Sequence, residues 1–209
     1  MGRYIGPACR ICRREGIKLF LKGTRCYMAK CPIDTGRPPP GMHGAHRGRK
    51  LSDYGLQLRE KQRLRRQYGM QEGQFRVFFD RVLRKKGVTG EMLLQQLESR
   101  LDTVVRRLGF APSQRAARQF VRHGHVLVNG VKATIPSMLL KAGSVIKVRD
   151  SARSRAKAAA SLEAVGGRGV PSWLSLDAQN LSGEFLRVPT RDEIAPAVNE
   201  RLVVELYSK

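Results

Sequence analysis

The sequence is poor in acidic residues. It has 17 Asp and Glu against 40 Lys and Arg in 209 residues, which gives a formal net charge of +23 at pH 7. A protein that acts on small molecules has no need of such an excess. A protein that binds a polyanion does, because each phosphate that it neutralises releases a condensed counterion. The charge therefore favours a nucleic-acid partner over a basic protein that has none.

Long apolar runs are also absent. No stretch approaches the roughly 20 consecutive apolar residues that span a bilayer, and the charged N-terminus lacks the apolar segment of a secretory signal. We therefore expect a cytoplasmic protein without a membrane partner, in a compartment where thiols stay reduced. A chain of 209 residues can form one large or two small domains with modest cores.

Cysteine is scarce and confined to one segment. The four cysteines form two close pairs, Cys9 with Cys12 and Cys26 with Cys31. Such pairs are typical of a tetrahedral zinc site, and the alternatives are two disulfides or four unrelated thiols. Four sulfur ligands leave no open coordination position, so we expect one structural zinc per chain and no catalytic metal. The pattern lacks the repeated recognition helix of zinc-finger proteins, so DNA is not an expected partner.

The clearest secondary-structure pattern begins with two helices near residue 98. Thr89 can cap a long helix that leads into this segment, and its apolar residues share one face: Leu97, Leu101, Val104 and Leu108. Ser113 is a good N-cap for the next helix, which is expected to end near Arg122. That helix carries Ala117, Phe120 and Val121 on one face. Its arginines fall on a different face: Arg115, Arg118 and Arg122.

Strands follow these helices. Asn129-Gly130 separates two β-prone runs, 126–128 and 131–133, and predicts a hairpin because both turn residues must take positive φ. Residues 145–148 predict a third strand. The resulting order is helix, helix, hairpin and strand, with Lys132 of the hairpin beside an arginine-bearing helix.

A second basic surface is predicted on an earlier helix. Ser52 can cap a helix from about residue 53 to 68, in which a narrow apolar stripe faces away from three arginines: Arg59, Arg63 and Arg66. Lys61 and Arg65 fall inside the apolar stripe. This pattern indicates a helix that packs on the protein with only part of its surface and binds an anionic partner with the rest. The alternative is a charged helix whose polar face is simply solvated.

The remaining elements are predicted from shorter patterns. Aromatic residues at helical spacing in 75–83 indicate a core helix and not a platform for stacking bases. Residues 151–165 are expected to be helical. Residues 171–176 predict an edge strand and residues 185–189 another strand.

The segment 98–150 resembles the RNA-binding module of the small-subunit ribosomal protein four family. The resemblance is carried by many residues in a fixed order: Leu101-Asp102, Arg106, Leu108-Gly109-Phe110, Ser113-Gln114-Arg115, Ala117-Arg118-Gln119, Val121, His123-Gly124-His125 and Val128-Asn129-Gly130. Further stretches are similar to the same family: Ser52-Asp53-Tyr54, Leu58-Arg59-Glu60-Lys61-Gln62, Asn199-Glu200 and 203–207. The resemblance therefore covers nearly the whole chain.

The resemblance and the cysteine spacing together lead us to expect an α+β fold. It consists of an N-terminal arm that binds zinc through the four cysteines, a helical domain, and an RNA-binding domain of helices packed on a small antiparallel sheet. We expect the arm and a Pro-rich linker to occupy 1–45 and the helical domain to occupy 46–97, joined by the C-terminal tail 187–209. The RNA-binding domain is expected to occupy 98–186, with its core module at 98–150.

The implied function is that of a structural constituent of the small ribosomal subunit, located in the cytoplasm in the ribosome. The resemblance also implies a primary binder of 16S ribosomal RNA (rRNA) that nucleates assembly of the subunit body and contributes to translational accuracy. The implied partners are this rRNA, neighbouring small-subunit proteins, and messenger RNA near its entry path.

An RNA-modifying enzyme is the alternative, because pseudouridine synthases carry a similar module. Arg100-Leu101-Asp102 is similar to the residues around the catalytic aspartate of those enzymes. Asp102, however, lies inside a predicted helix, and the chain leaves no room for a catalytic domain of usual size. We therefore expect Asp102 to pack or to form a salt bridge, and we expect no catalytic residue.

The expected RNA contacts come from the two basic surfaces and their surroundings. The first surface consists of Arg115, Arg118 and Arg122 with Lys132, and the second of Arg59, Arg63 and Arg66. The other expected contacts are basic, aromatic or histidine side chains: Arg47, Arg49, Lys50, Tyr54, Lys61 and His123.

Overall fold

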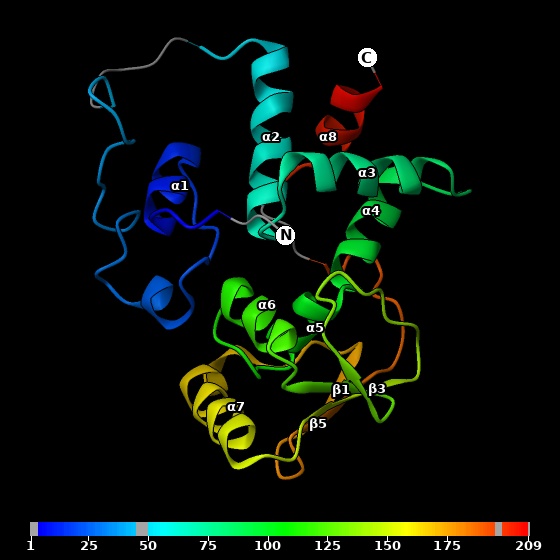
Figure 1. Ribbon diagram of the computed structural model, residues 1–209. Coiled ribbons are helices and arrows are strands. Elements are labelled where there is room, and N and C mark those ends of the chain that lie inside the picture. Colours follow the sequence, from blue (N-terminus) through cyan, green and yellow to red (C-terminus); the bar gives the residue numbers. More distant parts are fainter. Residues whose placement is uncertain (1–3, 45–49, 195–197, 209) are drawn as a thin grey trace. The chain divides into compact units, whose positions relative to one another are not determined.

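The computed structural model describes residues 4–44, 50–194 and 198–208 (Figure 1). The chain divides into two compact units: Met1–Leu94 with Ala195–Lys209, called unit 1, and Gln95–Ile194, called unit 2. The described residues form helices in both units and an antiparallel sheet in unit 2, which confirms the predicted α+β class.

The described part of unit 1 is helical. Its elements are α1 (Ala8–Glu15), the 3-10 helix η1 (Gly23–Tyr27), α2 (Asp53–Gln67), α3 (Glu72–Leu83), α4 (Thr89–Glu98), which continues into unit 2, and α8 (Glu200–Tyr207). The predicted cap of α2 is confirmed, because the Ser52 hydroxyl accepts a hydrogen bond from the Gly55 amide at 3.2 Å. Gly69 follows the helix with a φ of 63°, a conformation that glycine adopts at little cost.

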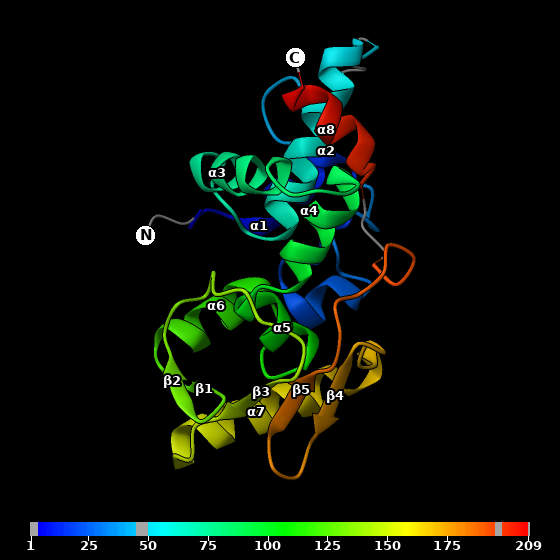
Figure 2. The same cartoon turned by 90° about the vertical axis from the view of Figure 1, so that its right-hand side faces the viewer.

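The core of unit 1 is built on the aromatic side of α3. Phe75 and Phe79 are fully buried, which confirms the predicted core helix, although Leu83 at its end is exposed. The C-terminal helix α8 packs along α2 (Figures 1 and 2). Its Tyr207 stacks on Phe79 with 4.5 Å between ring centroids and donates a hydrogen bond to Glu72 at 3.1 Å. The last helix of the chain thus completes the core of this unit.

Unit 2 combines three helices with a five-stranded sheet. Its elements are α5 (Leu101–Arg107), α6 (Gln114–Arg122), β1 (Val126–Val128), β2 (Val131–Ala133), β3 (Ser144–Val148), α7 (Ala152–Val165), the 3-10 turn η2 (Gly166–Arg168), β4 (Leu174–Asp177) and β5 (Ser182–Phe185). All strand pairs are antiparallel, in the order β2-β1-β3-β5-β4 (Figure 2). One apolar core joins α5, α6 and α7 to the sheet, and it includes Leu101, Val104, Val121, Ile146 and Phe185.

The hairpin of unit 2 forms as predicted. Asn129 and Gly130 both have positive φ, at 50° and 82°, and Val128 pairs with Val131 across the turn. The Asn129 side chain also accepts a hydrogen bond from the Val145 amide at 2.8 Å. The turn residue therefore links the hairpin to strand β3.

The prediction of one long helix into the module is wrong. Helix α4 ends at Glu98 and α5 begins at Leu101, because Arg100 takes an extended conformation and pairs with Leu139 in an isolated bridge. The Leu101 amide donates to the Met138 carbonyl at 2.8 Å. A distant loop thus takes the backbone donor that a continuous helix would use internally.

The last two strands differ in position from the predictions. The structure has β4 at 174–177, later than the predicted 171–176, and β5 at 182–185, earlier than the predicted 185–189. Gly183 lies in the middle of β5, where an added Cβ would lie 2.5 Å from the Leu108 side chain. Close packing therefore requires a residue that the sequence pattern treats as a strand breaker. The edge position predicted for the first of these strands is correct, since β4 ends the sheet.

Asp102 is a structural residue. Its fully buried carboxylate accepts hydrogen bonds from Arg100 Nε at 3.0 Å and from the Arg100 Nη2 at 2.9 Å, and it lies 3.5 Å from Arg118 Nη1. The expected salt bridge is thus confirmed. Charged groups at such depth are tolerated only because they are paired.

We predict that Asp102→Asn destabilises unit 2. Loss of the carboxylate charge leaves Arg100 buried without compensation, which costs about 3 kcal/mol. Urea unfolding can be followed through Trp173, the one tryptophan of the chain, which is buried in the core of unit 2. Asp150→Asn is the matched control, because the Asp150 side chain is 82% exposed. Equal unfolding midpoints in the two variants would contradict the assignment.

Candidate nucleic-acid interface

The first basic surface lies on α6. The predicted cap is confirmed, because the Ser113 hydroxyl accepts a hydrogen bond from the Ala116 amide at 3.3 Å. Ala117, Phe120 and Val121 face the core, as predicted. Arg115 is half-buried and Arg122 is exposed. The helix is therefore fixed by its apolar face and carries these two arginines on its other side.

Lys132 lies close to the end of this helix. A Cβ added to Gly124 would lie 2.3 Å from the Lys132 Cε, so the lysine side chain crosses the turn that follows α6. His123, in the same turn, is exposed. The structure thus brings these two predicted RNA contacts to the end of α6 that carries Arg122.

Arg118 has a different environment from its two neighbours on the helix. Its side chain is 12% exposed and forms an ion pair with the buried Asp102. The charge of Arg118 is thus shared with a carboxylate inside unit 2. Its contact with RNA stays a prediction. The helical spacing alone could not show that Arg118 pairs with Asp102.

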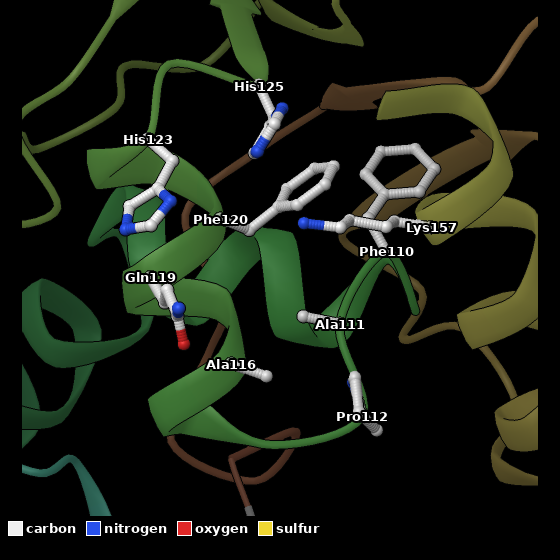
Figure 3. Close-up of a pocket in the computed structure, with 9 residues that line it drawn as sticks. All are labelled: Phe110, Ala111, Pro112, Ala116, Gln119, Phe120, His123, His125 and Lys157. Carbon is white, nitrogen blue, oxygen red and sulfur yellow. The ribbon is translucent and has the colours of Figure 1, made fainter. Parts of the chain in front are cut away.

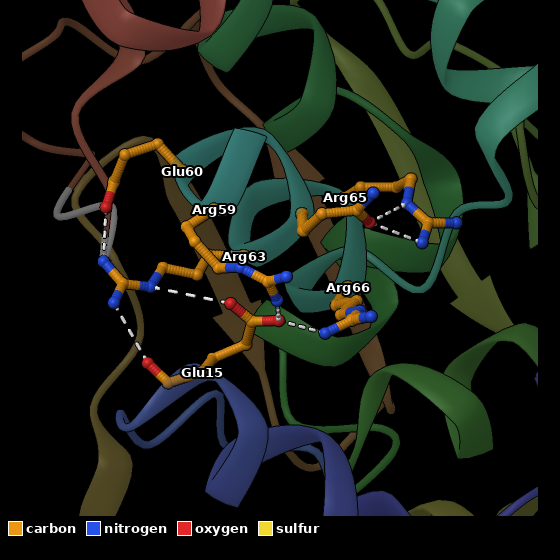
Figure 4. A network of polar contacts seen from close by, with 7 residues as sticks. Glu15, Arg59, Glu60, Arg63, Arg65 and Arg66 are labelled. Carbon is orange, nitrogen blue, oxygen red and sulfur yellow. Dashed lines mark hydrogen bonds and ion pairs between the residues drawn. The ribbon is translucent and has the colours of Figure 1, made fainter. Parts of the chain in front are cut away.

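The second basic surface contacts α1. Arg59, Arg63 and Arg66 of α2 all bind Glu15, the last residue of α1, and the Glu15 side chain is fully buried (Figure 4). Arg63 also donates to the Glu15 carbonyl at 3.0 Å and pairs with Glu60. The structure therefore brings the three predicted arginines together around one carboxylate.

Sequence reasoning did not single out Glu15. The available signal was its isolation, because Glu15 is the only acidic residue among the first 33. A single carboxylate in so basic a segment has few roles other than binding cations. That role fixes α1 to α2 within unit 1 and orders the arginines before any ligand binds.

The other predicted contacts have varied surroundings. Lys61 is buried, forms an ion pair with Glu72 and lies 5.7 Å from the centroid of the Tyr207 ring. Lys50 and Tyr54 are exposed. Arg47 and Arg49 lie outside the described residues. The structure thus gives Lys61 a role inside unit 1, and its RNA contact stays a prediction.

All four cysteines lie among the described residues, and none forms a disulfide. Cys12, Cys26 and Cys31 are buried, and Cys9 is half-buried. Burial raises the pKa of the Cys12 and Cys26 thiols. The Lys22 amide donates to the Cys26 sulfur at 3.3 Å, and the Leu19 amide donates to the Cys12 sulfur.

These cysteines have the chemistry of a zinc site. Amide hydrogen bonds to sulfur favour the thiolate form that zinc binds. Within the described ranges, however, no group of three or more His, Cys, Asp or Glu side chains is arranged to hold a metal ion. The donor set is therefore suitable for zinc, and the thiols of Cys12 and Cys26 lie near enough to the other cysteines for their charges to interact.

No helix in the described part of the chain is long and apolar enough to cross a membrane.

The chain matches two families in succession. Residues 3–98 match the ribosomal protein S4/S9 N-terminal domain, and residues 99–146 match the S4 domain. The basic surface of α6 and the hairpin beside it lie within the S4 domain match. These features define an S4-domain protein of the ribosomal type.

Full-length relatives identify the family more closely. The small ribosomal subunit proteins uS4 of Acidithiobacillus ferrooxidans and Thermus thermophilus are each 54% identical to the chain, and that of Trichlorobacter lovleyi is 56% identical. Each similarity covers 209 residues and the whole of both chains. The chain belongs to the uS4 family of small ribosomal subunit proteins. A member of this family is an rRNA-binding component of the ribosome and not an enzyme, as the sequence predicted.

We predict that Glu15→Gln loosens α1 from α2. A neutral amide leaves three guanidinium groups close together without a buried carboxylate, so α1 should open more often. Hydrogen exchange measured by mass spectrometry should be at least about tenfold faster in residues 8–15. Glu163→Gln is the control, because it removes one negative charge at an exposed position in α7. Unchanged exchange in α1 would show that Glu15 does not hold this contact.

Proposed function

We propose that the chain is a primary binder of 16S rRNA that nucleates assembly of the small-subunit body and contributes to translational accuracy. Its proposed partners are that rRNA, neighbouring small-subunit proteins, and messenger RNA near its entry path. The supporting observation is identity of 54–56% with uS4 proteins over the whole chain. The net charge of +23 provides the electrostatic attraction that an rRNA partner requires.

The proposed rRNA contacts of unit 2 lie along α6 and the turn that follows it. Arg115, Arg122, His123 and Lys132 form this set, and Arg118 contributes less because its charge is shared with Asp102. Phosphate contacts of this kind hold RNA through shape and backbone and not through base sequence.

The proposed contacts of unit 1 are the three arginines around Glu15. Three guanidinium groups meet the fully buried Glu15 carboxylate there, and Arg63 also pairs with Glu60, so the arginines still exceed the carboxylates by one charge that is left for phosphate. Two surfaces that bind one folded RNA raise the effective concentration for each other. We propose that Lys50, Lys61 and Tyr54 extend this surface, together with Arg47 and Arg49.

We predict that Arg115→Ala combined with Arg122→Ala weakens binding to 16S rRNA by at least about tenfold. Each lost phosphate contact lowers the slope of log affinity against log salt by roughly 0.7–0.9, so the slope should fall by about 1.5. Thermal stability should hardly change, because neither side chain belongs to the core of unit 2. Filter binding across a salt series measures both quantities.

The control for this experiment is Arg155→Ala combined with Arg187→Ala. These arginines pair with Asp150 and Glu193 on the surface of the same unit, so the net charge changes equally. The control variant should have nearly the same slope of log affinity against log salt as the unchanged protein. A double α6 variant with unchanged affinity and slope would mean that the rRNA surface lies elsewhere.

We also propose that Cys9, Cys12, Cys26 and Cys31 bind one structural zinc ion. Three buried thiols and the two amide hydrogen bonds to sulfur support this proposal. The bound ion would connect α1, which contains Cys9 and Cys12, to η1, which contains Cys26. In this proposal residues 1–45 form a zinc-binding arm, 46–97 with 187–209 a helical domain, and 98–186 the RNA-binding domain.

We predict that the purified protein carries one zinc ion per chain and that Cys26→Ser combined with Cys31→Ser abolishes it. Elemental analysis by mass spectrometry measures the metal content. Unfolding of unit 2, followed through Trp173, should be unchanged because the cysteines lie in unit 1. The control variant His43→Ala should retain the metal. Zinc-free native protein, or intact disulfides in freshly isolated protein, would refute the site.

A further inference from the structure

A pocket of about 260 Å³ opens between α6 and the beginning of α7 (Figure 3). Its inner wall includes the buried rings of Phe110 and Phe120, and its rim carries His123, His125 and Lys157. Pockets for drug-sized ligands have volumes of about 300–1,000 Å³. A smaller pocket with an apolar wall and a basic rim is suited to a single planar ring attached to an anionic group.

Two aromatic rings of the pocket are stacked, and a third is tilted beside them. The rings of Phe120 and His125 lie 4.9 Å apart between centroids, with 27° between their planes. His123 lies 6.2 Å from His125 with an angle of 35°. Rings in this arrangement can extend their stack to a nucleobase, because every base has a π-face and proteins use both Phe and His for this purpose.

A hydrogen bond to α7 fixes the orientation of the His125 ring. Its Nδ1 shares a hydrogen bond with the hydroxyl of the fully buried Ser154 at 2.8 Å. The Ser154 hydroxyl in turn shares a hydrogen bond with that of Ser151, the N-cap of α7, at 2.7 Å. This chain of hydroxyls occupies Nδ1 and leaves Nε2 for a ligand. Such a ring binds without losing much conformational freedom.

Positive charge gathers around the same ring. Burial lowers the pKa of His125, and the nearby Lys157, His123, Arg153 and Arg149 lower it further. These effects favour the neutral form of the imidazole, while the surrounding cationic side chains favour an anionic ligand. Arg153 and Lys157 are spaced i, i+4 on α7, a sequence pattern that indicates a basic helical face. Figure 3 shows the Lys157 ammonium directed toward Phe120.

We propose that this pocket binds one unstacked nucleobase of single-stranded RNA, with the adjoining phosphate on Lys157. The base stacks on the ring of His125, and the Gln119 amide, which also lines the pocket, is positioned to meet the edge of the base. Duplex RNA keeps its bases stacked inside the helix and cannot use the pocket in this way. The inference rests on the proposed rRNA-binding function and adds to it a site for an unpaired nucleotide.

Two substitutions test the pocket in the full-length protein. Ala116→Leu fills the pocket from α6 without a change in charge, and Lys157→Gln removes the proposed phosphate contact. Fluorescence anisotropy should show binding of a labelled single-stranded RNA hexamer weakened about tenfold by each, which lies within the range for loss of one base–aromatic stack. Binding of a blunt RNA duplex should be unaffected by Ala116→Leu. Circular dichroism checks that both variants remain folded.

Two matched controls complete the design. Lys141→Gln removes one positive charge from an exposed position of unit 2, and Ala159→Leu adds the same apolar bulk to an exposed position of α7. Each should change hexamer binding less than about twofold. Equal losses in Lys157→Gln and Lys141→Gln, with normal binding by Ala116→Leu, would show general charge attraction only and overturn the site.

Two further arms separate the alternatives. Adenosine 5′-monophosphate should displace the hexamer only at far higher concentrations, and displacement at equal concentrations would reassign the pocket to free nucleotides. Binding of 16S rRNA by the unchanged protein tests the proposed function separately. If the protein binds rRNA but its hexamer binding is insensitive to both pocket variants, only the pocket inference fails.

Discussion

In this strongly basic chain, ion pairs between buried carboxylates and arginines connect neighbouring elements of the fold. Glu15, Glu98 and Asp102 have fully buried side chains, and each binds at least one guanidinium group. A net charge of +23 opposes compaction through self-repulsion. A buried carboxylate relieves that repulsion locally, and it connects helices that the apolar contacts alone would hold less firmly. These three buried carboxylates therefore help to hold neighbouring helices in place.

The same pairs divide the basic residues by role. Arg100, Arg107 and Arg118 bind carboxylates within unit 2, whereas Arg122 and Lys132 are exposed at the end of α6. The ion pair of Arg118 with Asp102 links α6 to α5, and the exposed group is available to an anionic partner. Ordering of cationic side chains before binding reduces the entropy lost when a phosphate arrives. Around Glu15 one carboxylate orders three arginines, of which Arg63 also pairs with Glu60, so the positive charge exceeds the negative at that place as well.

The end of α6 concentrates several of these features in one region of unit 2. Arg122 is the last residue of the helix, and His123 and His125 follow it closely in the sequence. The Lys132 side chain lies against Gly124, between these two histidines in the sequence. The apolar core holds the helix from one side, and the hydroxyls of Ser151 and Ser154 hold His125 from another. A rigid support for basic and aromatic groups suits recognition of RNA, whose unpaired bases and phosphates lie close together along the strand.

The sequence by itself determined the features whose signals are local. Ser52 and Ser113 begin their helices through hydrogen bonds to amides three residues ahead, and Asn129-Gly130 turns the hairpin because both residues accept positive φ. The family was also determined by sequence, because the residues that carry the resemblance occur in a fixed order along nearly the whole chain.

Only the tertiary structure decided the features that depend on distant groups. The helix break at Arg100 requires the Met138 carbonyl, and the position of β5 requires the Leu108 side chain above Gly183. A helical wheel separates the polar and apolar faces of one helix, but it contains no information about the element opposite. The sequence pattern therefore could not show that Arg118 pairs with Asp102 or that the α2 arginines pair with Glu15, because folding alone brings these residues together.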